Sequence, residues 1–261
     1  MAGDAVGARE ALMRAEMWRH PGVVVIEPQF TLARAWLAAA EGSATTAVRH
    51  ARQAATLAAR SGQLAIEVLA RHAAVSFGDR AQAARLAELA RQVDGPRAPA
   101  AAAHAAALAT KNPAALLAAA AQLAAAGLML PAAEAAAQAT TLYRQQRDIP
   151  AAAAAARPAG ELASACEGAR TPALLAAAQP LPISERQREV AALAAAQLSN
   201  REIAKRLGVS TRTVEGHIYH ACVKLGLPDR AALSALFASS PIRAGQDQLT
   251  GDGHGARRLH E

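Results

Sequence analysis

Residues that could contact DNA share one face of a segment near the C-terminus. In residues 211–225 apolar side chains recur at helical spacing, which predicts a helix with a buried face formed by Val214, Ile218, Ala221 and Leu225. The opposite face carries a hydroxyl, a guanidinium, a carboxylate, a glycine and a phenol, from Thr211, Arg212, Glu215, Gly216 and Tyr219. Such a helix can place its N-terminal residues on base edges in the major groove, while its capped amino end and nearby cations hold phosphates.

Four short helices that would position this face follow from capping residues. The expected N-caps are, in chain order, Ser184, Asn200, Ser210 and Asp229. Gln187 is spaced to complete a capping box with Ser184, and Gly208 is expected to end the helix over 201–207. Because the helices over 201–207 and 211–225 are joined by so tight a turn, the sequence predicts a helix-turn-helix unit. The last helix, 229–237, completes the domain.

The sequence of this segment also matches a known pattern. It contains Leu-Pro-Ile-Ser-Glu-Arg-Gln-Arg-Glu-Val, then Leu-Ser-Asn-Arg-Glu-Ile-Ala-Lys-Arg-Leu-Gly-Val-Ser, then Thr-Val-Glu-Gly-His-Ile, and then Lys-Leu-Gly. The run closely resembles the LuxR-type helix-turn-helix domain over about residues 181–238. The resemblance implies a four-helix domain that binds double-stranded DNA, usually as a homodimer through the helix 229–237.

The resemblance also assigns roles by position. Phosphate contacts would come from Arg201, Lys205, Arg212 and Lys224. Base contacts would come from Glu215, Gly216 and Tyr219, and the candidate DNA-binding set also includes Asn200, Thr211 and Thr213. Relatives often carry a cation at 215, asparagine at 220 and a cation at 223, where this chain has Glu215, His220 and Val223. Glu215 can accept from cytosine N4 but also repels phosphates, so the operator stays open.

Upstream, residues 30–168 are almost entirely helix formers punctuated by glycine and proline. The expected helices lie near 30–41, 45–60, 64–77, 80–93, 98–110, 113–126, 131–146 and 151–166. Paired, they repeat at roughly the 34-residue length of a tetratricopeptide unit. We therefore expect an all-α chain in which an alanine-rich array of helical hairpins precedes the four-helix domain. An irregular alanine-rich bundle is the alternative.

Changes in composition predict the domain organisation. We expect an N-terminal segment over 1–29, the array over 30–168, a linker over 169–182, the helix-turn-helix domain over 183–238 and a disordered tail over 239–261. The linker is expected to be extended because it contains Thr171-Pro172, Gln179-Pro180 and Leu181-Pro182. Array and DNA-binding end together resemble the last two parts of the large ATP-binding LuxR-family regulators. The Gly-x-x-x-x-Gly-Lys-Ser/Thr loop of an ATP site is missing.

Other classes of function find little support. The net charge of +7 suits a polyanionic partner. His217 and His220 are spaced for a shared metal but have no third ligand, so we expect no metal and no cofactor. No nucleophile, base and orienting group form a recognisable set, so we expect no enzyme. We expect a cytoplasmic, nucleoid-associated bacterial protein with reduced thiols at Cys166 and Cys222 and no membrane partner.

The sequence thus favours a transcriptional regulator that reads the major groove with the helix 211–225. In this interpretation the helical array receives a protein partner or a small effector. The alternative is a protein-docking adaptor or modulator whose DNA binding is weak or vestigial, which Glu215 and Val223 favour.

Overall fold

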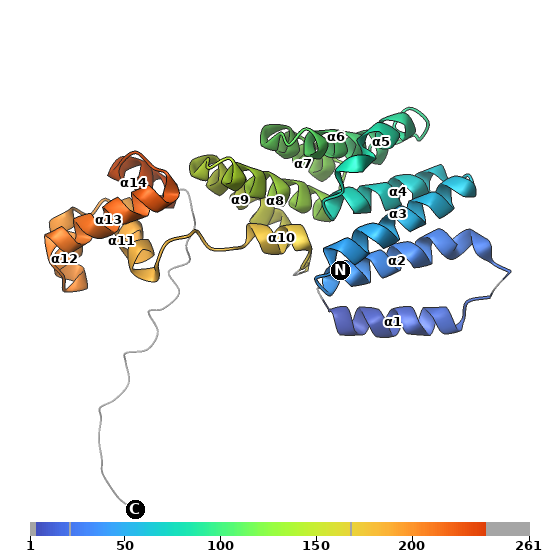
Figure 1. Ribbon diagram of the computed structural model, residues 1–261, viewed down its shortest axis with the longest axis horizontal. Helices are drawn as coiled ribbons and strands as arrows, with labels where there is room; N and C mark the ends of the chain where they lie inside the picture. The colour runs from blue at the N-terminus through green and yellow to red at the C-terminus, as the bar shows by residue number, and fades with distance from the viewer. Residues whose placement is uncertain (1–3, 21, 168, 239–261) are drawn as a thin grey trace, which may run out of the picture.

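The computed structural model describes residues 4–20, 22–167 and 169–238. Every regular element in these ranges is a helix, so the all-α prediction is confirmed. The helices form an array that continues into a smaller group at the C-terminal end (Figure 1). The tail 239–261, which was expected to be disordered, lies outside the described residues. None of the described helices is both long and apolar enough to cross a membrane.

The array is built from successive helical hairpins. Its elements are α2 (Glu27–Ala40), α3 (Ala44–Arg60), α4 (Leu64–Ser76), the 3-10 turn η2 (Arg80–Gln82), α5 (Ala83–Leu89), α6 (Arg97–Ala109), α7 (Pro113–Ala125), α8 (Met129–Gln145) and α9 (Ile149–Ser164). All the predicted helices are present, and most of their observed boundaries lie within about two residues of the predicted ones. The main difference is the helix expected over 80–93, which begins as a 3-10 turn and ends as an α-helix at Leu89.

Alanine dominates the packing between these helices. Between α2, α3 and α4 one cluster of buried residues consists of seven alanines and Phe77, with Trp36 packed against it. Trp36 and Phe77 make an edge-on ring contact at 4.8 Å between centroids. Because an alanine methyl buries little apolar surface, this pair contributes disproportionately to the start of the array.

A buried chain of polar side chains joins three hairpins of the array. His72 Nε2 on α4 lies 3.1 Å from His104 Nδ1 on α6, and His104 Nε2 lies 2.9 Å from Gln138 Oε1 on α8. The Gln138 amide then donates back to the carbonyls of Val75 and Ser76 at the end of α4. Burial lowers the pKa of both histidines, that of His104 to about 4, so both rings are neutral at pH 7. In a neutral imidazole one ring nitrogen donates and the other accepts, so His104 can accept from His72 and donate to Gln138.

Two segments outside the predicted array are also helical. The N-terminal segment contains α1 (Ala5–Met17) and the 3-10 turn η1 (Val24–Ile26), and the array begins at Glu27. The expected linker contains α10 (Pro172–Ala177), which lies against α8 (Figure 1). Thr171 is extended, as expected before a proline, but our expectation was wrong from Pro172 onward, because Thr171 caps α10 and Pro172 takes its first position, where proline is tolerated. The Arg144 guanidinium donates to the Ala176 carbonyl and holds α10 in place.

The C-terminal group comprises α11 (Glu185–Ala195), α12 (Asn200–Leu207), α13 (Thr211–Leu225) and α14 (Arg230–Ala238). Its hydrophobic core also includes Ile149, the first residue of α9, and Ala153 packs against the same core. The backbone carbonyl of Arg147 lies 4.0 Å from the position that a β-carbon would take on Gly226. The array and the C-terminal group are therefore in direct contact. The domain boundary at 169–182 stays a prediction.

Candidate DNA-binding site

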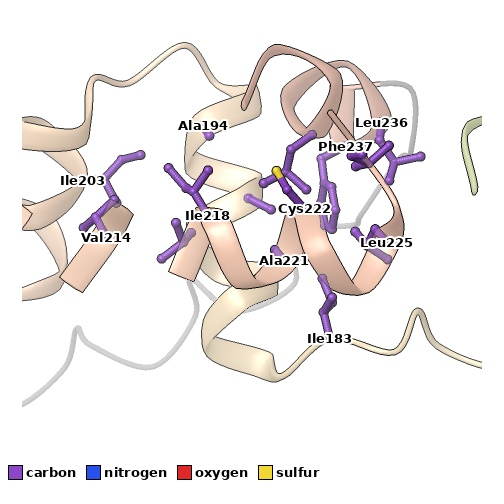
Figure 2. Packing of buried hydrophobic residues seen from close by; sticks show 14 of the residues in the cluster. Ile183, Ala194, Ile203, Val214, Ile218, Ala221, Cys222, Leu225, Leu236 and Phe237 are labelled. Carbon is purple, nitrogen blue, oxygen red and sulfur yellow. The ribbon is translucent and has the colours of Figure 1, made fainter. Parts of the chain in front are cut away.

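A single apolar core fixes the four C-terminal helices. Ile203 of α12 and Val214 of α13 lie together at one end, and Ile218, Ala221, Cys222 and Leu225 continue along α13 toward Leu236 and Phe237 of α14 (Figure 2). The predicted buried face of α13 is confirmed at all four of its positions. Because this face is buried, the opposite face of α13 is turned to solvent.

The turn between α12 and α13 has the predicted geometry. Gly208 ends α12 in the left-handed conformation at φ 64°, where glycine has no steric penalty. The Ser210 side chain then accepts from the Thr213 amide and starts α13. This short connection sets the directions of the two helices, as a helix-turn-helix unit requires.

The start of α12 differs from our expectation. Its N-cap is Ser199, not Asn200, because Ser199 and Glu202 form a reciprocal capping box. Asn200 is the first residue inside the helix, and its buried Oδ1 has no hydrogen-bond partner among the described residues. The other three predicted caps, Ser184, Ser210 and Asp229, are confirmed.

The predicted base-reading side chains share one face of α13. Thr211, Arg212, Glu215 and Tyr219 are exposed, and the Tyr219 side chain has 66% of its surface accessible. Val223 continues the same face one turn later and is 60% exposed. Sequence reasoning treated Val223 only as a missing cation. Its exposure next to Tyr219 gives the face an apolar end that could meet a thymine methyl group.

Gly216 lies on this face with free space around it. A β-carbon built there would meet no protein atom within 4 Å, and its backbone is ordinary helix. Glycine in a helix interior costs about 1 kcal/mol relative to alanine. Packing within the described chain does not require glycine at 216, whereas close approach of a ligand to the backbone would.

The predicted phosphate-binding cations differ in their surroundings. Arg201 and Lys205 on α12 and Arg212 on α13 are exposed, and none forms an ion pair with another described residue. Lys224 is exposed too, but its ammonium donates to Gln187 Oε1 at 3.1 Å. The structure thus ties Lys224 to the start of α11 and leaves the other three cations available.

Two arginines outside the predicted DNA-binding set hold the helices of the site together. Arg186 of α11 donates to the Leu207 carbonyl at the end of α12 and also pairs with Glu189. Arg230 of α14 donates to the Leu198 carbonyl in the α11–α12 loop. Both bonds satisfy carbonyls that would otherwise lack partners, and they fix α12 relative to its neighbours. No local spacing in the sequence predicts such long-range contacts.

The remaining candidate residues have structural surroundings. The Thr213 hydroxyl lies 2.8 Å from Ser210 Oγ and belongs to the cap of α13. His217 is half-buried and His220 exposed, and the described residues contain no group of three or more potential metal ligands. Cys222 is buried, and its thiol donates to the Asp229 carbonyl.

Comparison of the sequence with known proteins identifies the family of the C-terminal helices. Residues 181–237 match the family model described as bacterial regulatory proteins, luxR family. Over 36 residues, 14% of this chain, the sequence is 61% identical to a Mycobacterium tuberculosis (strain ATCC 25618 / H37Rv) protein named as an HTH-type transcriptional regulator, Rv0890c. That match spans 4% of the relative's length. No solved structure matches the chain. The C-terminal four-helix group of this chain is therefore a LuxR-family helix-turn-helix domain.

Proposed function

We propose that this chain is a transcriptional regulator that binds double-stranded DNA by laying α13 in the major groove. The observation that carries the proposal is the solvent-facing side of α13, where base-contacting residue types surround a glycine that the protein's own packing does not need. The cations of α12 and the start of α13 would hold the flanking phosphates. The family of the domain and the name of the M. tuberculosis relative support the same function.

The proposed complex is a homodimer in which α14 forms the contact between subunits. Leu233, Leu236 and Phe237 of α14 are used in the domain's own core. A dimer would therefore use the other side of α14, where Ala231 and Ala238 are exposed. We further propose that the helical array receives a partner or effector in a cytoplasmic, nucleoid-associated protein.

A second candidate function has one observation in its favour. Glu215 is exposed on the reading face and forms no ion pair with another described residue, so its charge would oppose a nearby phosphate. A chain that docks proteins through its array and binds DNA weakly would tolerate such a residue.

Selection from a pool of random duplexes with the intact protein separates the two functions. A regulator should enrich a two-fold-symmetric motif, and Glu215→Gln should change the preferred bases at fixed positions within each half-site. An adaptor should retain duplexes without enrichment. If wild-type protein with an intact helical spectrum shows no preference for any base sequence, the proposed regulator is contradicted.

A further inference from the structure

A large apolar cavity lies at the other end of the molecule, between α1 and α2. Its volume is about 660 Å³, within the 300–1,000 Å³ range typical of small-molecule sites. On the α2 side it is lined by Phe30, Trp36 and Leu37, and on the α1 side by Leu12 and by small residues such as Ala11 and Ala15. The chain has three phenylalanines and two tryptophans, and one of each faces this cavity.

The helices α1 and α2, which lie on either side of the cavity, are held together by ion pairs and not by apolar packing. Arg9 of α1 pairs with Glu41 after α2 at 2.5 Å, and Glu16 of α1 pairs with Arg34 of α2 at 2.6 Å. The third pair, Arg19 with Glu27, lies near the loop that joins the helices. None of the described residues of α1 is buried. The helix is thus fastened at its edges, and the apolar surface between α1 and α2 stays open.

The chemistry of the wall defines what it can bind. The residues that line the cavity include no arginine, lysine or histidine, and their one ionisable group is the Asp4 carboxylate, which caps α1 by accepting from the Gly7 amide. A charged ligand would lose its hydration against this largely apolar wall, and an anion would meet no cation on it. An uncharged apolar molecule would cover Phe30, Trp36 and Leu37 and remove apolar surface from water.

We propose that the α1–α2 cavity binds a neutral, largely apolar small molecule that fills the space between the two helices. This site lies outside the DNA-binding domain, and the proposal does not depend on DNA binding. The neutral aromatic dye N-phenyl-1-naphthylamine is a suitable probe. Trp36 lines the cavity, whereas Trp18 is 88% exposed, so Trp18→Phe leaves one reporter at the site.

The experiment titrates the dye into the intact Trp18→Phe protein and follows energy transfer from Trp36. We expect saturable transfer with one site per chain. Filling the cavity from α1 with Ala11→Phe and Ala15→Leu, or from α2 with Ala33→Leu, should weaken binding about tenfold or more. Glu10→Leu adds a leucine to α1 at a position that does not line the cavity, and it should leave the affinity unchanged.

Helical content and sedimentation are measured on every variant. Ala11, Ala15 and Ala33 are exposed, so larger side chains at these sites displace no buried residue, and at least one filled variant should keep the wild-type helical spectrum. Absence of transfer in the Trp18→Phe protein would overturn the proposal. The proposal would also be overturned if filled and unfilled variants bound the dye with equal affinity, or if the protein were a dimer that had to dissociate to expose the cavity. The measurement contains no DNA, so its failure would leave the proposed regulator intact.

Discussion

Gly216 is the residue whose presence the fold explains least and the proposed function explains best. Gly216→Ala should raise the free energy of unfolding by up to about 1 kcal/mol, because alanine favours the helix and meets no protein atom there. The same substitution should weaken DNA binding, because the methyl group would stand between α13 and the bases. Urea unfolding and duplex titration measure the two effects separately.

Gly160 on α9 provides the matched control for this substitution. It also lies in a helix, with nothing within 4 Å of the position that an added methyl group would take, but far from α13 in sequence. Gly160→Ala should stabilise the protein similarly and leave DNA affinity unchanged. Equal DNA affinity of Gly216→Ala and wild type would show that close backbone approach plays no part in binding.

Glu134 is a residue at which stability should depend on pH. Its carboxyl group on α8 is fully buried, and this burial raises its pKa to about 7, although the nearby Ser76 and Thr171 hydroxyls act in the opposite direction. The folded state therefore holds a proton that the unfolded state releases above its ordinary carboxyl pKa of 4.5. The stability of the folded state should fall as pH rises from about 4.5 to about 7.

Glu134→Gln should remove this dependence. We expect the variant to gain stability over wild type between pH 5 and pH 8, by an amount on the order of 3 kcal/mol. The buried His72 and His104 destabilise the fold at acid pH in both proteins, so their effect cancels in the difference. Urea midpoints at the two pH values measure it, with Glu161→Gln on the exposed side of α9 as control. A difference that stays constant with pH would refute the buried protonated carboxyl.

The sequence did not reveal that Glu134 is buried. It sits in the run Pro131–Gln138, where alanines on every side leave no hydrophobic periodicity to separate an inner from an outer face. The same composition hid the pairing of His72 with His104. By contrast, α13 mixes large apolar and polar residues at clear helical spacing, and its buried and exposed faces were both predicted.

At the scale of the helix, the start of α12 tests how the recognition unit is built. Ser199→Ala should destabilise α12 by about 1 kcal/mol because it removes the acceptor for the Glu202 amide. Asn200→Ala should cost less, because Asn200 caps nothing. Hydrogen exchange of the peptide covering 198–210 in the intact protein measures both. Faster exchange in Asn200→Ala than in Ser199→Ala would restore Asn200 as the cap.

Helix boundaries were largely predictable because glycine, proline and capping residues mark them. The error at α12 arose because serine and asparagine are both good N-caps in adjacent positions, and only Glu202, spaced three residues after Ser199, selects between them. At α10 the error had the opposite source. Thr171-Pro172 can end a helix or begin one. In the structure it begins α10, whose Ala176 carbonyl accepts from Arg144, a residue distant in sequence.

For the whole molecule, the contact of α9 with the DNA-binding domain is the feature that composition could not predict. Ile149 is buried in the core of α11–α14, although it belongs to a helix that precedes the expected linker. Ile149→Ala should cost about 2–5 kcal/mol at this site. Hydrogen exchange in α11 and α14 should quicken, because the lost contact supports their core.

Leu116→Ala in α7 is the matched control, since it removes the same number of carbon atoms from a buried site within the array. It should leave exchange in α11 and α14 close to wild type. If both variants leave α11 and α14 unchanged, the segment 169–182 insulates the two parts, as its proline content suggested. If Ile149→Ala alone affects them, a signal received by the array has a physical route to the DNA-binding helices.

The most direct test of DNA recognition by α13 is the salt dependence of binding by the intact protein. Fluorescence anisotropy with a duplex from the selection, and with a scrambled duplex, compares wild type with Arg212→Ala and with Arg60→Ala, which changes an exposed residue of α3. Wild type and Arg60→Ala should prefer the selected duplex. Arg212→Ala should bind both duplexes more weakly, with a salt slope reduced by about one unit, as the loss of one phosphate contact requires. Equal binding of the two duplexes by wild type, or an Arg212→Ala curve that matches wild type at every salt concentration, would contradict the assignment of α13 as the DNA-reading helix.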